Sequence, residues 1–117
     1  MTRNQLTGQK GEQLAREYFI ERGYDILHNN WRYSHLELDI IASKKNTLHF
    51  IEVKTLAQGS VGLPEESVNK KKMMNLMKAA ELFMLTEKRF SKIQFDILAV
   101  VLNNAQPSFF LLEDVYF

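Results

Sequence analysis

Four charged residues lie in the two apolar runs that flank the turn SKKNT, in the segment LELDIIASKKNTLHFIEVK over residues 36–54. They are Glu37, Asp39, Glu52 and Lys54. Carboxylates in apolar surroundings lose hydration and repel one another, so they usually need a compensating cation. Magnesium prefers carboxylate, water and phosphate oxygens, and could supply that charge. The segment therefore raises the possibility of metal-assisted chemistry.

The alternation of side chains along a strand indicates which of these groups lie together. Glu52 and Lys54 share one face of their strand, and Glu37 and Asp39 share one face of the preceding strand. A hairpin of this length can bring Asp39 opposite the segment that holds Glu52. Two interpretations follow. Asp39 and Glu52 bind a divalent metal, or Lys54 forms a cross-strand salt bridge with Glu52 or Glu37, worth roughly 0–1 kcal/mol if exposed.

Other chemistries find less support in the sequence. The chain has no cysteine, which excludes disulfides, thiolate zinc sites and cysteine nucleophiles. His28, His35 and His49 do not form a helical metal-binding pair, and we expect structural or solvent-facing roles for them. No glycine-rich phosphate loop and no nucleophile elbow occurs. Any metal must therefore be held by oxygen or histidine.

The elements that position these groups can be read from periodicity. Apolar residues at helical spacing predict a helix over residues 11–22, and Gly23 is suited to end it in the left-handed conformation. A strand is predicted over residues 24–34. The segment of residues 36–54 then forms two strands around the polar turn SKKNT. These three strands form a meander.

The second half of the chain predicts a helix followed by two strands. Pro64, Glu65 and Glu66 resemble a helix start, because acidic residues complement the positive end of the helix dipole. The expected apolar stripe of this helix consists of Met73, Leu76, Met77, Ala80, Phe83 and Met84. Strands over residues 93–102 and 108–117 follow, joined by the turn NNAQP. The predicted fold is α/β, a mixed sheet flanked by helices in the order α-β-β-β-α-β-β.

Length and composition suit a single domain over residues 1–117. The 117 residues are 45% hydrophobic and 25% charged, and no apolar run approaches the ~20 residues that span a bilayer. The N-terminus lacks the apolar core of a secretory signal, so we expect a cytoplasmic protein with no membrane partner. Net charge is only +1, but Lys70, Lys71 and Lys72 cluster in NKKK, either as a phosphate-binding surface or as a solvated helix face.

The order of the motifs resembles a known family. Asp39, twelve further residues and then Glu52-Val53-Lys54 resemble the PD-(D/E)xK core of restriction-endonuclease-like nucleases. The wider set GQKGEQLAREYFIERGYDILHNNWR, ELDIIA, FIEVKT, VGLPEESVNKKK and QFDILAV resembles the YraN-like family and covers nearly the whole chain in order. This family is similar to archaeal Holliday junction resolvases. The resemblance implies a restriction-endonuclease-like fold.

The resemblance also implies roles for individual residues. Asp39 and Glu52 would bind Mg²⁺ or Mn²⁺, and Lys54 would orient the attacking water. Glu12 would approach the metal from the first helix, unless it is an exposed first-turn glutamate favoured by the helix dipole. Glu37 would be a carboxylate next to the metal ligands or at a second metal.

The expected function is thus hydrolysis of DNA phosphodiester bonds by a metal-dependent endonuclease, with branched or junction DNA as a candidate substrate. Lys70, Lys71 and Lys72 would contribute to the nucleic-acid surface. Related resolvases act as dimers, which makes a homodimer a further expectation. The alternatives are a noncatalytic nucleic-acid-binding module that keeps the fold and a structural protein whose charges only pair.

Overall fold

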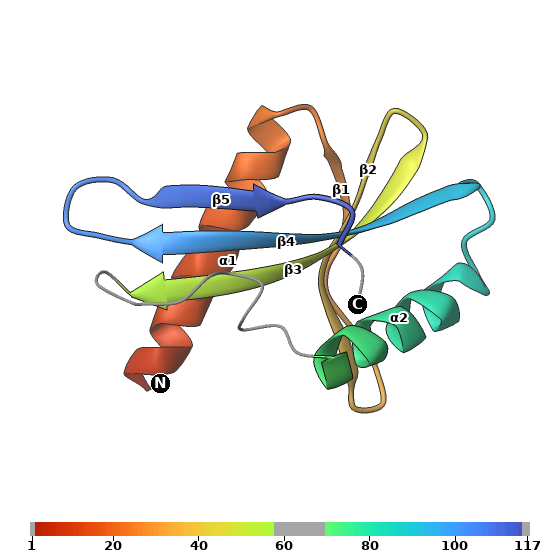
Figure 1. Ribbon diagram of the computed structural model, residues 1–117, viewed down its shortest axis with the longest axis horizontal. Coiled ribbons are helices and arrows are strands. Elements are labelled where there is room, and N and C mark those ends of the chain that lie inside the picture. Colours follow the sequence, from red (N-terminus) through yellow and green to blue (C-terminus); the bar gives the residue numbers. More distant parts are fainter. Residues whose placement is uncertain (1, 58–69, 116–117) are drawn as a thin grey trace.

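A five-stranded mixed sheet and two helices make up the computed structural model, which describes residues 2–57 and 70–115 (Figure 1). In chain order the elements are α1 (Arg3–Glu21), β1 (Asp25–Tyr33), β2 (Leu36–Lys44), β3 (Thr47–Ala57), α2 (Lys70–Met84), β4 (Lys92–Leu102) and β5 (Ser108–Leu112). The strands lie in sequence order across the sheet, with β3 and β4 parallel and the other neighbours antiparallel. The predicted α/β class and element order are confirmed, and they are compatible with a restriction-endonuclease-like fold.

The first helix begins eight residues earlier than predicted. The Gln5 N–H donates to the Thr2 hydroxyl (3.1 Å), and the Gln5 side chain accepts from the Thr2 N–H (2.9 Å). This reciprocal capping box satisfies two main-chain donors that a helix start would otherwise leave unpaired. The segment before residue 11 is polar and lacks apolar periodicity, so the cap and not the periodicity marks the start.

The predicted end of α1 at Gly23 is confirmed. Gly23 has a φ of +87°, which costs glycine little because it lacks a Cβ. The Tyr24 N–H donates to the Phe19 carbonyl (3.0 Å) and the Gly23 N–H to the Ile20 carbonyl (3.1 Å). The Tyr24 and Phe19 rings also pack edge to face at 4.9 Å. Together these contacts form a Schellman motif with its hydrophobic contact.

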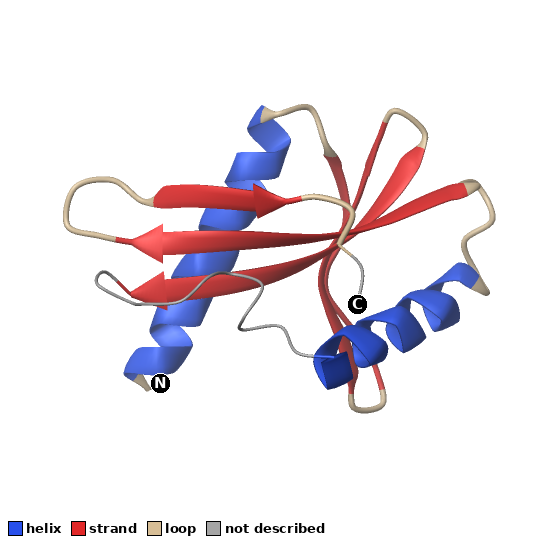
Figure 2. Cartoon of the chain, in the orientation of Figure 1, coloured by secondary structure: helices blue, strands red, loops and turns tan. Residues whose placement is uncertain are grey.

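Alternation along β3 separates two cores, one on each face of the sheet. Leu48 and Phe50 pack with α2, whereas Ile51 and Val53 pack with α1. In Figure 2, α1 passes behind β3, β4 and β5, and α2 lies beside β1 and β2. The two helices therefore cover opposite faces, and the sheet between them carries the polar side chains of the candidate site.

The buried face of α2 differs from the predicted stripe. It consists of Met73, Leu76, Ala79, Ala80 and Phe83. The assignment of Met77 to the core was wrong, because its side chain is 46% exposed and Ala79 is buried in its place. Ala79 and Ala80 are both almost fully buried, so the face of α2 that contacts the sheet is rotated toward residue 79 relative to the predicted stripe. The predicted start at Pro64 lies outside the described residues.

The remaining connections are short. Lys45 and Asn46 both have positive φ, 49° and 67°, as the two central residues of a type I′ hairpin between β2 and β3 require. The last strand ends at Leu112, five residues earlier than predicted. Over residues 2–57 and 70–115, none of the helices is long and apolar enough to cross a membrane.

Gly11 brings α1 against β3. It is buried, and a Cβ added to it would lie 1.8 Å from the Thr55 hydroxyl oxygen and 2.8 Å from the Thr55 Cβ. The helix can cross the strand at this distance only because residue 11 has no side chain. This crossing places Glu12, the next residue, beside the end of β3 that carries Glu52 and Lys54.

We predict that Gly11→Ala destabilises the protein by about 1–3 kcal/mol, because the added methyl group forces α1 away from Thr55. Gly8→Ala is the matched control, since a Cβ at Gly8 meets nothing within 4 Å. It should stabilise the helix by about 0.5–1 kcal/mol, the ordinary gain from replacing a helical glycine. Urea unfolding followed by circular dichroism measures both changes. Equal effects of the two substitutions would contradict the close-approach explanation.

Candidate metal centre

The site lies where β2 and β3 separate. Their ladder runs from the Lys44–Thr47 pair to the Ile40–Ile51 pair and stops there. Strand β3 instead stays paired with β4 along its whole length, from Thr47 to Ala57. Figure 1 shows the first half of β2 turning away from the second half of β3. The separation opens space between two strand segments that both carry carboxylates.

Asp39 occupies the point of separation. Its Oδ2 accepts a hydrogen bond from the Val53 N–H at 2.9 Å, so a side-chain carboxylate takes the place of a main-chain acceptor. The side-chain alternation of β2 also changes here, since Leu38 packs in the core under α2 and Ile40 in the core under α1. The pairing of Asn29 with Ile40 and of Trp31 with Leu38 places Asn30, whose φ is +53°, opposite Asp39. This change in the alternation of β2 turns the Asp39 carboxylate toward β3.

Glu52 lies next to this carboxylate and is paired with a lysine of α2. Its Oε1 is 2.7 Å from the Lys72 Nζ, and the Glu52 side chain is only 6% exposed. Glu52, Asp39, Glu37 and Lys72 line one cavity of about 220 Å³. The other residues around this cavity are His35, Leu36, Asn75 and Leu76. The structure therefore brings Asp39 and Glu52 together, as the spacing predicted.

The environment of Asp39 disfavours its negative charge. Burial, followed by the nearby charge of Glu52, raises the pKa of Asp39 from 3.8 to about 7. Glu12 and Glu37 raise this pKa further, and only the hydrogen bond from Val53 lowers it. For Lys72, partial burial by itself lowers the pKa, but the hydrogen bond and charge of Glu52 outweigh it and the pKa is raised. The cavity thus favours positive charge.

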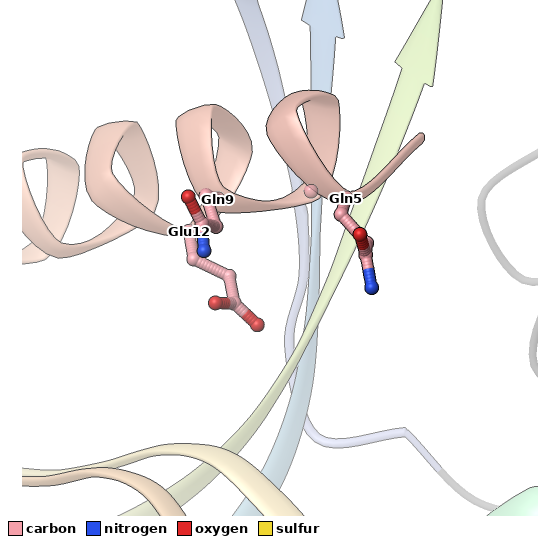
Figure 3. A pocket seen from close by; sticks show the side chains of 4 residues that line it. Gln5, Gln9 and Glu12 are labelled. Atoms are coloured by element: carbon pink, nitrogen blue, oxygen red, sulfur yellow. The ribbon is translucent and has the colours of Figure 1, made fainter. Parts of the chain in front are cut away.

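Glu12 approaches the same carboxylates from α1. Burial raises its pKa, and so do the charges of Glu37 and Glu52, while the Asn30 side chain opposes the shift by hydrogen bonding. Figure 3 shows Gln5 and Glu12 projecting from one side of α1, where they line a hollow of about 500 Å³. Because α1 starts at Arg3, Glu12 is not in its first turn, and the first-turn explanation for this residue is wrong.

The other predicted site residues are more scattered. Lys54 is half-buried on β3, and within the described residues no carboxylate lies in salt-bridge distance of it. The alternative interpretation, a salt bridge between Lys54 and Glu52 or Glu37, is therefore wrong. Glu37 faces Arg32 across the β1–β2 pair at 3.4 Å. Lys70 and Lys71 are exposed, as expected of a solvated or phosphate-binding surface.

Sequence reasoning did not place Lys72 or His35 in the cavity. Lys72 was assigned to an outer surface, but it reaches inward to Glu52. Its position one residue before the buried Met73 was a signal, because that residue lies at the edge of the helix face that contacts the sheet. His35 lines the cavity from the β1–β2 turn, and its sequence neighbours did not indicate this.

Comparisons with known proteins follow the same segments. The model of the uncharacterised protein family UPF0102 matches residues 11–100, from the Gly11 crossing to β4. The chain belongs to this family. A UPF0102 protein of Parabacteroides distasonis is 33% identical over 100% of the chain and 97% of its own length. Relatives from Christiangramia forsetii (36% identical, 100% of the chain and 98% of the relative) and Dictyoglomus thermophilum (39%, 87% of each) bear the same family description. UPF0102 is the YraN family, so the family predicted from the motifs is confirmed.

The residues of the cavity fit a magnesium ion by donor type. Magnesium usually takes one or two carboxylates and completes its shell with waters and substrate phosphates, and Asp39 and Glu52 are two carboxylates on one cavity. In the part of the chain that the structure describes, no three His, Asp or Glu side chains stand close enough to hold a metal by themselves. The fit therefore rests on two ligands and on a cavity that favours positive charge.

We predict that Asp39→Asn stabilises the metal-free protein at high pH. A folded pKa of about 7 lies above the ordinary 3.8, so the wild type loses stability as the pH rises from about 4 to about 7, and the neutral amide does not. The variant should be more stable by about 4 kcal/mol at pH 8 and equal to wild type near pH 3.5. Urea unfolding in chelator across this range measures the difference. Asp25→Asn, at the exposed start of β1, is the control, and parallel curves for wild type and Asp39→Asn would refute the prediction.

Proposed function

We propose that this protein is a divalent-metal-dependent endonuclease that hydrolyses DNA phosphodiester bonds in the cytoplasm. The observation that carries the proposal is the pair of carboxylates, Asp39 and Glu52, on one cavity at the split between β2 and β3. The raised pKa of Asp39 supports it, because strongly shifted carboxylates in a cleft are typical of functional sites. The resemblance to PD-(D/E)xK nucleases adds the substrate class.

The chain's own residues would divide the work as follows. Asp39 and Glu52 would hold the metal, which when bound supplies Lewis-acid stabilisation of the charge on the phosphate. Glu12 and Glu37 would add negative potential and bind waters next to this position. Lys54, on the same β3 face as Glu52 and without a carboxylate partner among the described residues, would orient the water that attacks phosphorus.

The DNA would reach this cavity past the start of α2. Lys70 and Lys71 are exposed there, and lysine ammonium groups bind phosphates without regard to sequence. A nuclease that reads the shape of branched or junction DNA needs contacts of this kind more than base contacts. The two exposed lysines therefore support recognition of the DNA backbone and not of the base sequence.

Metal binding and cleavage test the proposal together. Calorimetry with Mg²⁺ or Mn²⁺ should show binding by wild type that Asp39→Asn abolishes, because one of two protein ligands loses its charge. Branched, nicked, single-stranded and duplex DNA, with RNA for comparison, should then be tested for cleavage. Asp25→Asn is the control for loss of one surface carboxylate. Metal binding that is absent, or unaffected at Asp39, would refute the metal site, and DNA binding without cleavage would indicate a noncatalytic module.

Replacing Lys54 tests the role of the water-orienting residue. We predict that Lys54→Ala lowers cleavage by about 10²-fold or more while metal affinity and the free energy of unfolding change little, because its interaction forms in the transition state. Lys54→Arg should restore only part of the rate, since a planar guanidinium cannot replace a compact ammonium. Lys92→Ala, at the exposed start of β4, controls for the loss of one positive charge. Cleavage at the wild-type rate by Lys54→Ala would exclude this role.

A further inference from the structure

We propose that the Lys72 ammonium is a resident cation, which holds Glu52 until a divalent metal displaces it. The inference rests on the proposed function and concerns how its metal site is filled. The Lys72 Nζ lies 2.7 Å from the Glu52 Oε1, and both side chains line the cavity that also contains Asp39. The ammonium therefore occupies an oxygen that the metal would need.

The exposure of the two partners indicates which one can move. The Glu52 side chain is 6% exposed and is held in β3, whereas the Lys72 side chain is 44% exposed and approaches from α2. A lysine can turn its charged end into water while its stem stays in place. The carboxylate cannot follow, and a buried carboxylate without a partner is strongly unfavourable. Lys72 can leave Glu52 at low cost only when another cation arrives.

Competition follows from this geometry. Two cations cannot share the same carboxylate oxygen at contact distance without repelling each other. The free energy of metal binding to the wild type is thus that of a site without the lysine, less the free energy of the Lys72–Glu52 pair. A pair of this kind also keeps the carboxylates compensated when metal is scarce, so the fold does not depend on metal for its stability.

Lys72→Gln separates this role from a purely structural one. Without the ammonium, Mg²⁺ or Mn²⁺ should bind about tenfold more tightly, which corresponds to about 1.4 kcal/mol. Lys78→Gln, an exposed lysine on the same helix that does not line this cavity, makes the same change in net charge. Titration calorimetry of both variants and of wild type measures the affinities. In chelator, Lys72→Gln should unfold at a lower urea concentration than Lys78→Gln, and saturating metal should remove that difference.

A second measurement does not require Lys72→Gln to fold. The Cε resonance of Lys72 in ¹³C-lysine-labelled wild type should shift on addition of Mg²⁺, and it should remain unchanged in Asp39→Asn, where metal binding is lost. The Cε resonance of Lys78 is the internal reference.

The outcomes distinguish the two proposals. Tighter metal binding by Lys72→Gln than by Lys78→Gln, with a Lys72 shift in wild type, supports both. Asp39-dependent metal binding of equal affinity in all three proteins, or an unmoved Lys72 resonance, overturns the resident-cation role and leaves the metal site standing. No metal binding by wild type or by Lys72→Gln overturns both.

Discussion

The repulsion between Asp39 and Glu52 is the interaction on which the arrangement of this molecule depends. Asp39 loses hydration in the cavity, and the nearby charge of Glu52 makes it harder to ionise. The fold compensates them with one main-chain N–H, that of Val53, and one ammonium, that of Lys72. A segment that served only to form the core would gain nothing from two buried carboxylates that repel each other. Local unfavourable interactions of this kind are characteristic of functional sites.

The separation of β2 from β3 allows the fold to accommodate the repulsion between Asp39 and Glu52. A parallel partner, β4, pairs with β3 over all eleven residues and holds it in place after β2 has turned away. The Val53 N–H, which the separation leaves without a main-chain acceptor on β2, donates to the Asp39 carboxylate. The break in the ladder therefore also accounts for the position of this carboxylate. The close crossing of α1 at Gly11 brings Glu12, which lines a separate hollow, near enough for its charge to raise the pKa of Asp39. Three elements thus converge because the sheet is incomplete at this point.

Local rules predicted the parts of the site that depend on neighbours in sequence. Alternation placed Glu52 and Lys54 on one face of their strand, and Gly23 ended α1 through its own backbone. The partner of Glu52 depends instead on where α2 docks, and the periodicity of NKKKMMNLMK does not determine the rotation of the helix. With about 100° between successive residues, the choice between Met77 and Ala79 as core residues also moves Lys72 between solvent and cavity. The shape of the opposing sheet surface, which no local pattern contains, made that choice.

A second buried carboxylate shows what a structural acid looks like in the same fold. Asp96 of β4 is 2.7 Å from the His49 Nδ1 and also accepts hydrogen bonds from the Gln94 side chain and the Asp114 N–H. These contacts join β3, β4 and the segment after β5, and they place polar partners at both carboxylate oxygens, as a stable buried network requires. Within residues 2–57 and 70–115, Asp39 has a single hydrogen bond, from Val53, and the charges of Glu52, Glu12 and Glu37 act on it. The chain can therefore satisfy a buried acid fully, and the unfavourable environment of the Asp39 charge is a property of that site and not of the sheet that carries it.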